Sequence, residues 1–501
     1  MGGGTLAFGL AGTGLTVLLL ERGDFLPQER QNWDPVEVFG RGRYQNAEKW
    51  YAADGTAFVP GTYYYVGGNT KFYGGSLPRF RREDFDAVQH ADGLSPAWPF
   101  GYDDLAPYYA RAEQLYDVHG ADNDPTLVRE KDFPFPAVPH EPAIAALADR
   151  LTKNGLTPST IPLGVDLRPD GTCIRCATCD GFPCRLLAKA DAERNAVRPA
   201  LRSPNVTLLT NTYVRRVLTD PSGAIVRGVE VETDGEVREF LAPTVAVSCG
   251  AVNSAALLLR SRSEQHPQGL ANSSGLVGRR YMVHNNTVAM AIDPRRKNRT
   301  VFQKTLYVND HYLPGSGGQR DALGHVQMIG KLQGSMLKAQ RPRIPEWLLR
   351  LVAERSTDWW LFTEDLPDPE NRVTLTDAGD IQVAYTPNNV AAHKKLVRKI
   401  RKALRRAGYP ILVSQRAGIE VNSHQAGTVC AGTDPATSVL DPQCAAHDVG
   451  GLYVVDSAFF PSLPVMNPAL TIAANALRVA DHIAQQTPRD AAAQPQSSTQ
   501  N

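Results

Sequence analysis

Short apolar runs alternate with amphipathic stretches along most of the chain. Alternating or continuous apolar runs of about four to eight residues predict strands, whereas apolar residues spaced three and four apart predict helices. We expect helices at residues 6–10, 103–116, 141–153, 188–201, 255–259, 389–407 and 469–484. We expect strands at residues 15–20, 206–209, 213–219, 225–232, 242–248, 287–292, 325–329, 372–375 and 381–385. Strands followed by helices predict an α/β fold, and the short strands within residues 262–423 predict a second, sheet-rich part.

Residues 5–20 are almost free of charge and could be mistaken for a signal peptide or a membrane anchor. The segment has no basic residues before its apolar core, and it falls short of the roughly 18 apolar residues that a spanning helix requires. Gly12 and Gly14 divide it into a short helix, a turn and a buried strand that leads into Glu21. We therefore expect a folded segment and no membrane anchor.

A helix, a turn and a strand in this order match the second half of a βαβ dinucleotide-binding unit. In that unit the pyrophosphate lies on the helix N-terminus, and a carboxylate about 20 residues further on binds the ribose. Gly2 and Gly3 would open the helix, and Glu21 would bind the ribose beside Arg22. The strand that normally precedes the helix has no counterpart here. Losing about five or six buried side chains at about 1.5–3 kcal/mol each would match the usual net stability of roughly 5–15 kcal/mol, so we expect a longer N-terminus in the working protein.

Composition and charge argue against several classes of protein. Apolar residues make up 42% and charged residues 21%, an ordinary globular balance. Lys and Arg number 53 and Asp and Glu 52, so the formal charge is +1, which gives no reason to expect a nucleic-acid or anionic-membrane partner. Seven cysteines in a long chain do not suggest a secreted disulfide scaffold. No targeting segment is visible, and we expect a cytoplasmic protein.

The expected helix at residues 389–407 carries eight Lys and Arg side chains. These cations could bind an anion, but Val397, Ile400 and Leu404 on the opposite face favour a solvated helix surface. The polar tail, residues 486–501, is expected to be disordered.

A cysteine-rich loop, CIRCATCDGFPC, occupies residues 173–184. The first three cysteines, each separated by two residues, are spaced like iron–sulfur ligands, but the spacing to the last cysteine departs from that pattern. Zinc is a further possibility, although four ligands within twelve residues leave little chain to wrap a metal. We favour a structural loop, disulfide-bonded or lined with thiols, near the substrate entrance, and expect no metal.

Five motifs occur in order along the chain. They are GGG with LLLERG at residues 2–23, VGGNTKFYGG at 66–75, GAVNSAALLLRS at 250–261, HQAGT at 424–428, and GLYVVDS with PSLPVMNP and a helix at 451–483. Together they resemble the glucose–methanol–choline family of FAD oxidoreductases. Within that family the chain looks most like the bacterial pyranose oxidases, C-glycoside 3-oxidases and glucoside 3-dehydrogenases.

The resemblance implies oxidation of a secondary ring hydroxyl, at C3 or C2 of a glucose-like pyranose or glycoside, to a ketone. Hydride loss from a neutral alcohol is slow, so a base must take the hydroxyl proton, and His suits this task because its pKa lies near neutrality. The family's base falls on His424, and its partner falls on Asn467. An Asn can orient the hydroxyl but cannot take its proton. O2 or a quinone would accept the electrons.

The resemblance also implies non-covalent FAD, because the loop at residues 66–75 lacks the His through which some members bind flavin. Gly67 and Gly68 would let the backbone approach the flavin ring. The remaining contacts implied by the family pattern are Asn69, Thr70 and Phe72 in the same loop, Val214 at the adenine, Gly250, Asp456 and Ser457 near the ribityl–phosphate region, and the helix N-terminus at Pro468 and Ala469. That N-terminus would stabilise negative charge on the reduced flavin.

The implied architecture has two discontinuous domains. A Rossmann-like FAD domain would contain residues 1–84, 190–260 and 424–485. A substrate domain with a mixed or antiparallel sheet, as in p-hydroxybenzoate hydroxylase-like proteins, would contain residues 85–189 and 261–423. Two alternatives remain open: a sterol-type or other alcohol oxidoreductase of the same family, and a non-catalytic flavin-binding protein that would not need His424 and Asn467.

Overall fold

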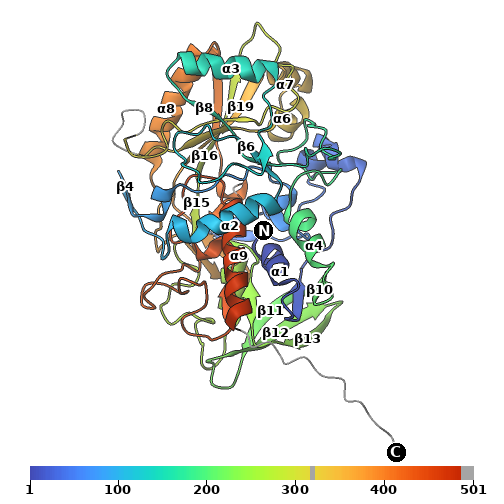
Figure 1. Cartoon of the computed structure of the whole chain (residues 1–501), viewed down its shortest axis with the longest axis vertical. Helices are drawn as coiled ribbons and strands as arrows, with labels where there is room; N and C mark the ends of the chain where they lie inside the picture. The colour runs from blue at the N-terminus through green and yellow to red at the C-terminus, as the bar shows by residue number, and fades with distance from the viewer. Residues whose placement is uncertain (316–321, 422, 487–501) are drawn as a thin grey trace, which may run out of the picture.

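The computed structural model describes residues 1–315, 322–421 and 423–486 (Figure 1). Segments from the two ends of the chain, blue and red in Figure 1, lie side by side in the lower half of the molecule. The upper half contains a large sheet covered by helices. Residues 487–501 of the expected tail lie outside the described residues.

Parallel strands and the helices beside them form the lower half. β1 (Val17–Leu20) pairs with β10 (Val206–Leu209), and β14 (Val245–Val247) pairs with β24 (Leu452–Val454). Among the described residues, no strand is hydrogen-bonded to both pairs. Helix α5 (Ala251–Arg260) follows β14 directly, and this strand–helix order agrees with the predicted α/β fold.

Two helices from opposite ends of the chain pack closely in this half. α1 (Gly2–Leu10) lies against α9 (Ala469–Gln486), and a Cβ atom added at Gly9 would lie only 2.6 Å from the Cβ of Ala480. Only a residue without a side chain allows this approach. α2 (Tyr102–Leu115) also packs on α9, where the hydroxyls of Tyr109 and Thr471 are 2.7 Å apart.

An antiparallel meander lies beside the parallel strands. Its strands are β11 (Tyr213–Thr219), β12 (Val226–Thr233) and β13 (Glu236–Leu241). The first two match the prediction within one residue. β13 was not predicted, because it is almost wholly exposed and its charged sequence gives no apolar alternation.

The upper half is built on a six-stranded sheet in which every pairing is antiparallel. In spatial order its strands are β22 (Ile411–Arg416), β16 (Asn285–Ile292), β19 (Ser356–Thr363), β18 (His325–Met328), β17 (Leu306–Val308) and β8 (Pro158–Thr160). Side chains of α3 (Pro142–Lys153) and α8 (Val390–Arg406) join those of the sheet in one apolar core. An antiparallel sheet is one of the two forms that the sequence predicted.

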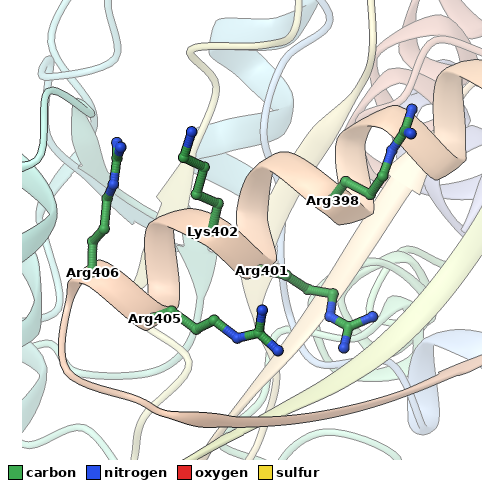
Figure 2. Close-up of a pocket in the computed structure, with 5 residues that line it drawn as sticks. All are labelled: Arg398, Arg401, Lys402, Arg405 and Arg406. Carbon is green, nitrogen blue, oxygen red and sulfur yellow. The ribbon is translucent and has the colours of Figure 1, made fainter.

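Helix α8 is amphipathic, with Leu396, Ile400 and Leu404 buried against the sheet. Five basic side chains project from it and line a shallow hollow: Arg398, Arg401, Lys402, Arg405 and Arg406 (Figure 2). None of the five forms an ion pair within the part of the chain that the structure describes. The arrangement is that of a solvated helix face.

A smaller sheet joins early and late segments of the chain. It contains β20 (Arg372–Leu375), β21 (Ile381–Ala384), β2 (Trp50–Ala52) and β3 (Ala57–Phe58). The remaining elements are β4 (Val88–His90), β5 (Gly93–Ser95), β6 (Val118–Gly120), β7 (Phe135–Pro136), β9 (Leu163–Gly164), β15 (Met282–Val283), β23 (Gln425–Ala426), α6 (Gly334–Gln340) and α7 (Glu346–Ala353). No helix in the described ranges has both the length and the apolar character needed to cross a membrane.

The helix predicted at residues 188–201 is shorter in the structure. A π-helical turn spans Glu193–Val197 and continues into α4 (Arg198–Ala200). The preceding residues are extended instead, and the side chains of Asp191 and Glu193 bind the buried Lys71 at 2.9 and 2.6 Å. A tertiary ion pair therefore overrides the local helical pattern.

Candidate active site

The imidazole of His424 lies where two short strands bring distant segments together. β23 begins one residue after His424 and pairs with β15, which ends one residue before His284. The antiparallel register aligns Val283 with Gln425. His284 comes after Val283 and His424 comes before Gln425, so the two histidines flank the same end of this pair. Their Nδ1 atoms are 3.0 Å apart. His284 was not predicted as a site residue, because no recognised motif surrounds it.

The hydrogen bonds of His284 fix the tautomer of His424. The Nε2 of His284 lies 2.9 Å from the carbonyl oxygen of Pro464, which can only accept, so this nitrogen carries the proton. Burial lowers the pKa of His284 to about 4, so its ring is neutral and its Nδ1 is an acceptor. His424 must then donate its Nδ1–H to His284. Its Nε2 consequently presents a lone pair, as a general base requires.

The surroundings keep His424 unprotonated. Burial lowers the pKa of His424 well below its ordinary value, and His284, Lys304 and His325 lower it further. The ring of Phe362 stacks on His424 with centroids 5.6 Å apart and an angle of 26°. His325 stacks in turn on Phe362. A neutral imidazole can accept a proton at neutral pH.

Asn467 lies beside His424. Its Nδ2 is 3.5 Å from the Nε2 of His424, and its Oδ1 is 3.1 Å from the Oγ of Ser76. The separation from His424 is longer than an ordinary hydrogen bond. Helix α9 begins at Ala469, and the carbonyl of Pro468 accepts its first hydrogen bond from Ile472 at 3.0 Å. The structure thus brings His424 and Asn467 together at the N-terminus of a helix.

Strand β18 supplies further polar groups that the sequence analysis missed. His325 and Gln327 alternate along the strand and therefore project on the same face. The Oε1 of Gln327 is 3.2 Å from the Oγ of Ser76. Alternation within β18 was the available signal, but all four residues of the strand are buried, which hides the inward-facing set.

The nucleotide end of the expected cofactor site lies around the N-terminus of α1. A Cβ atom at Gly2 would come within 2.2 Å of the carbonyl oxygen of Val455, and the backbone N–H of Gly3 donates to the Oγ of Ser248 at 2.8 Å. Glu21 follows β1 and accepts from the backbone N–H of Gly23 at 2.9 Å. Burial raises the pKa of Glu21.

Arg22 is held between two aromatic rings. Its guanidinium lies 4.2 Å from the ring centroid of Tyr64 and 4.7 Å from that of Tyr213, and it contacts Glu48 at 3.3 Å. Val214 follows Tyr213 in β11, where it pairs with Val231. Arg22 thus packs against the strand on which the adenine contact was expected.

Asp456 and Ser457 connect three elements of the site. The carboxylate of Asp456 accepts from the backbone N–H groups of Gly250 at 3.0 Å and Ala458 at 2.8 Å. The Oγ of Ser457 donates to the carbonyl of Gln425 at 2.6 Å. These bonds tie the end of β24 to the start of α5 and to the strand next to His424.

The loop at residues 66–76 is braced by contacts within the loop and with the neighbouring Tyr63. Asn69 accepts from the backbone of Tyr63 at 3.0 Å, and Thr70 donates to the carbonyl of Gly67 at 2.6 Å. The ring of Phe72 stacks on Tyr63 with centroids 3.7 Å apart. The side chains expected beside the flavin therefore also hold the shape of the loop.

Two glycines near the expected flavin site face space that no protein atom occupies. Gly67 and Gly68 adopt φ angles of 98° and 55°, and Gly250 one of 88°, which favour glycine. A Cβ atom added at Gly68 or Gly250 would meet no protein atom within 4 Å, although both residues are partly buried. Open space at these two glycines, with Glu21 and the starts of α1 and α9, suits an FAD molecule.

Two buried lysines fasten the cysteine-rich loop to this site. Lys189 donates to the carbonyl oxygens of Tyr73 at 2.6 Å, Cys179 at 3.1 Å and Phe182 at 2.8 Å. Lys304 binds Asp180 at 2.8 Å, and a Cβ atom at Gly74 would lie 2.0 Å from the Lys304 ammonium.

The four cysteines, Cys173, Cys176, Cys179 and Cys184, are free thiols rather than disulfides. No metal-binding group of three or more ligands occurs in the described parts of the chain.

Comparison with known proteins identifies the family of this chain. Residues 44–286 and 367–476 match the N- and C-terminal parts of the GMC oxidoreductase family. The 6'''-hydroxyparomomycin C oxidase of Streptomyces lividus is 32% identical over 98% of this chain and 91% of its own length. The paromamine 6'-oxidase of Streptomyces fradiae is 30% identical over 96% of this chain and 89% of its own length.

A solved structure shares the fold. The pyridoxine 4-oxidase from Mesorbium loti aligns with a TM-score of 0.63 and 18% identity, covering 97% of this chain and 98% of the other. Together with the sequence matches, this places the chain in the GMC oxidoreductase family, which comprises FAD-dependent enzymes that act on CH–OH groups.

Proposed function

We propose that this enzyme oxidises a secondary ring hydroxyl, at C3 or C2 of a glucose-like pyranose or glycoside, to the keto-sugar, with O2 or a quinone as electron acceptor. The observation that carries the proposal is the pairing of His424 and Asn467 across 3.5 Å, with a lone pair on the Nε2 of His424. A hydroxyl placed between these two groups would find one acceptor for its proton and one donor for its oxygen.

The chain's own residues divide the proton transfer between them. The hydroxyl proton passes to the Nε2 of His424, while Asn467 donates to the hydroxyl oxygen and holds it in place. His284 continues to accept from the Nδ1–H of His424 and so stabilises the imidazolium that forms. The flavin of FAD, when bound, supplies the acceptor for the hydride that leaves carbon. Rings of Phe362 and His325 exclude water from one side of the base.

We assign FAD binding to the residues of the family pattern. Gly2, Gly3 and Glu21 would hold the pyrophosphate and ribose, beside Arg22 and Val214. Gly67, Gly68, Asn69, Thr70 and Phe72 would shape the loop against the ring, and Gly250, Asp456, Ser457, Pro468 and Ala469 would border the remainder. Lys71, which is engaged by Asp191 and Glu193, and a loop without His favour non-covalent attachment. Acid precipitation should then release all of the yellow colour, whereas colour in the pellet would contradict this assignment.

A second candidate is oxidation of the 6-hydroxyl of an amino sugar to an aldehyde. It is favoured by the name of one relative, a paromamine 6'-oxidase, which covers nearly the whole chain. A sterol-type or other alcohol oxidase of the same family is the remaining alternative, since membership of an enzyme family argues against a non-catalytic flavin-binding protein.

The position of oxidation can be measured directly. The purified enzyme is mixed without oxygen with glucose, simple glucosides, amino sugars and a sterol, and flavin bleaching is followed by absorbance. NMR of the product then locates the new carbonyl. A ring ketone at C3 or C2 supports the proposal, and an aldehyde at C6 supports the second candidate. Bleaching by the sterol alone, or by none of these alcohols, contradicts both.

A further inference from the structure

The hydroxyl of Ser76 lies between the amides of two residues from different parts of the fold. Its Oγ is 3.1 Å from the Oδ1 of Asn467 and 3.2 Å from the Oε1 of Gln327. Ser76 ends the loop at residues 66–76, Gln327 lies in β18, and Asn467 precedes α9. The three residues are 3%, 1% and 9% exposed, so water is largely excluded from this contact.

Counting protons decides how these groups are connected. A serine hydroxyl has one proton and can donate to only one of the two amide oxygens. The Nδ2 of Asn467 faces the lone pair on the Nε2 of His424, which fixes its Oδ1 toward Ser76. Ser76 must therefore donate to Asn467. Gln327 can pair with the same hydroxyl only if its amide is turned so that Nε2, and not Oε1, faces it.

We infer that Gln327 and Ser76 form a donor relay that fixes the orientation of the Asn467 amide. The N–H of Gln327 donates to the Oγ of Ser76, and the O–H of Ser76 donates to the Oδ1 of Asn467. This leaves the Nδ2 of Asn467 directed at the position of the reacting hydroxyl. Ser76 and Gln327 are positioning residues, because they act on substrate through Asn467. The inference rests on the proposed function.

Without the relay the amide of Asn467 has a second orientation. A rotation of 180° would place its Oδ1 opposite the lone pair on His424, so that two acceptors face each other and the substrate oxygen loses its donor. Removing the Ser76 hydroxyl permits this rotation. A glutamate at position 327 has the same effect once it is ionised, because a carboxylate can only accept and takes the hydrogen bond of the Ser76 hydroxyl for itself; since burial raises the pKa of such a carboxyl, this variant is measured at high pH.

The test uses Ser76→Ala, Ser76→Thr and Gln327→Glu in the FAD-loaded enzyme, each alone and combined with Asn467→Ala. The reduction rate and the substrate Kd are measured by anaerobic stopped-flow with the best substrate of the wild-type enzyme. Ser76→Ala and Gln327→Glu should each slow reduction by about tenfold or more. Ser76→Thr keeps the hydroxyl and should stay within about threefold of wild type. FAD content and Tm show whether each variant folds.

The combined variants separate this role from a merely structural one. If Ser76 acts through Asn467, adding Ser76→Ala to Asn467→Ala should change the rate by less than about twofold. A full effect of Ser76→Ala in the Asn467→Ala background overturns the relay, as does an unaltered rate in Ser76→Ala itself. If no sugar reduces the wild-type flavin, the proposed function fails first, and the two failures are thereby distinguished.

Discussion

The chemistry of the site depends on which nitrogen of each histidine carries a proton. A backbone carbonyl, that of Pro464, sets the tautomer of His284, and His284 sets that of His424. An oriented partner for a catalytic imidazole is a general requirement of base catalysis by histidine. Here the partner, His284, is a neutral ring instead of a carboxylate, so the proposed base His424 gains orientation without a strong rise in its pKa.

Replacing His284 should therefore disturb the base without removing it. In His284→Leu the Nδ1–H of His424 loses its acceptor, and we expect flavin reduction to slow by about 10- to 100-fold because the wrong tautomer becomes accessible. In His284→Asn a side-chain oxygen can accept in place of the ring nitrogen, and most of the rate should return. Equal losses in both variants, measured by anaerobic stopped-flow, would assign His284 a packing role only.

Lys304 should set the pH at which the base becomes protonated. Its positive charge lowers the pKa of His424, so Lys304→Met should raise that pKa. The base is active when deprotonated, and the acidic limb of the reduction rate should therefore move to higher pH. Lys297→Met, which removes an exposed lysine paired with Glu354, is the control and should leave the limb in place. A limb that stays fixed or moves to lower pH in Lys304→Met contradicts this electrostatic account.

Three packed elements place the site: His424 directly precedes β23, the turn before α9 carries Asn467, and the loop at residues 66–76 carries Ser76. α9 is anchored by its close contact with α1, where Gly9 faces Ala480. Displacing α9 would therefore move Asn467 and the start of the helix together. The precision of the site depends on helix packing some distance away from it.

That packing predicts an unusual response to Gly9→Ala. In the interior of a helix, replacing glycine by alanine ordinarily raises the free energy of unfolding by about 0.5–1 kcal/mol. Here the new methyl group would meet Ala480, and overpacking should lower the free energy of unfolding by about 1–3 kcal/mol. Denaturant unfolding of Gly9→Ala, Ala480→Gly and the double variant measures this. A stabilised Gly9→Ala, or no coupling between the two changes, would contradict the described contact.

Local patterns predicted the elements whose apolar residues alternate or repeat regularly. β10 and β11 have the predicted bounds, and α8 differs by one residue at each end. β19 was missed because it is buried on both faces and bears charged Asp358 within it, so it shows no clean alternation. His424 and Asn467 could be proposed from motifs, whereas His284, Gln327 and Ser76 reach the site only through tertiary pairing.

At the scale of the whole molecule, the expected FAD site is assembled from segments spread over most of the chain. The starts of α1, α5 and α9, the loop at residues 66–76 and the ends of β1 and β24 all border it. A ligand that binds only this assembled state stabilises it by mass action. The exposed basic face of α8 lies on a different element, packed on the six-stranded sheet, and takes no part in the site.

Removing FAD should therefore weaken the whole molecule and not just one loop. At FAD concentrations about 100-fold above the Kd for FAD, binding should add about 2.7 kcal/mol to the free energy of unfolding. The Tm should therefore rise with added FAD. Differential scanning calorimetry of the stripped and reloaded protein checks this expectation. A Tm that is indifferent to FAD would mean that the assembled segments do not form its site.

The central claim is that the imidazole of His424 takes the proton of the substrate hydroxyl. Its most direct measurement is the rate of flavin reduction by sugar, without oxygen, in wild type, His424→Ala and the control His266→Ala, whose ring binds the distant carbonyl of Gly223. We predict that His424→Ala keeps its FAD and slows reduction by about 10²- to 10⁴-fold, while His266→Ala matches wild type. Reduction of His424→Ala at the wild-type rate would contradict the account.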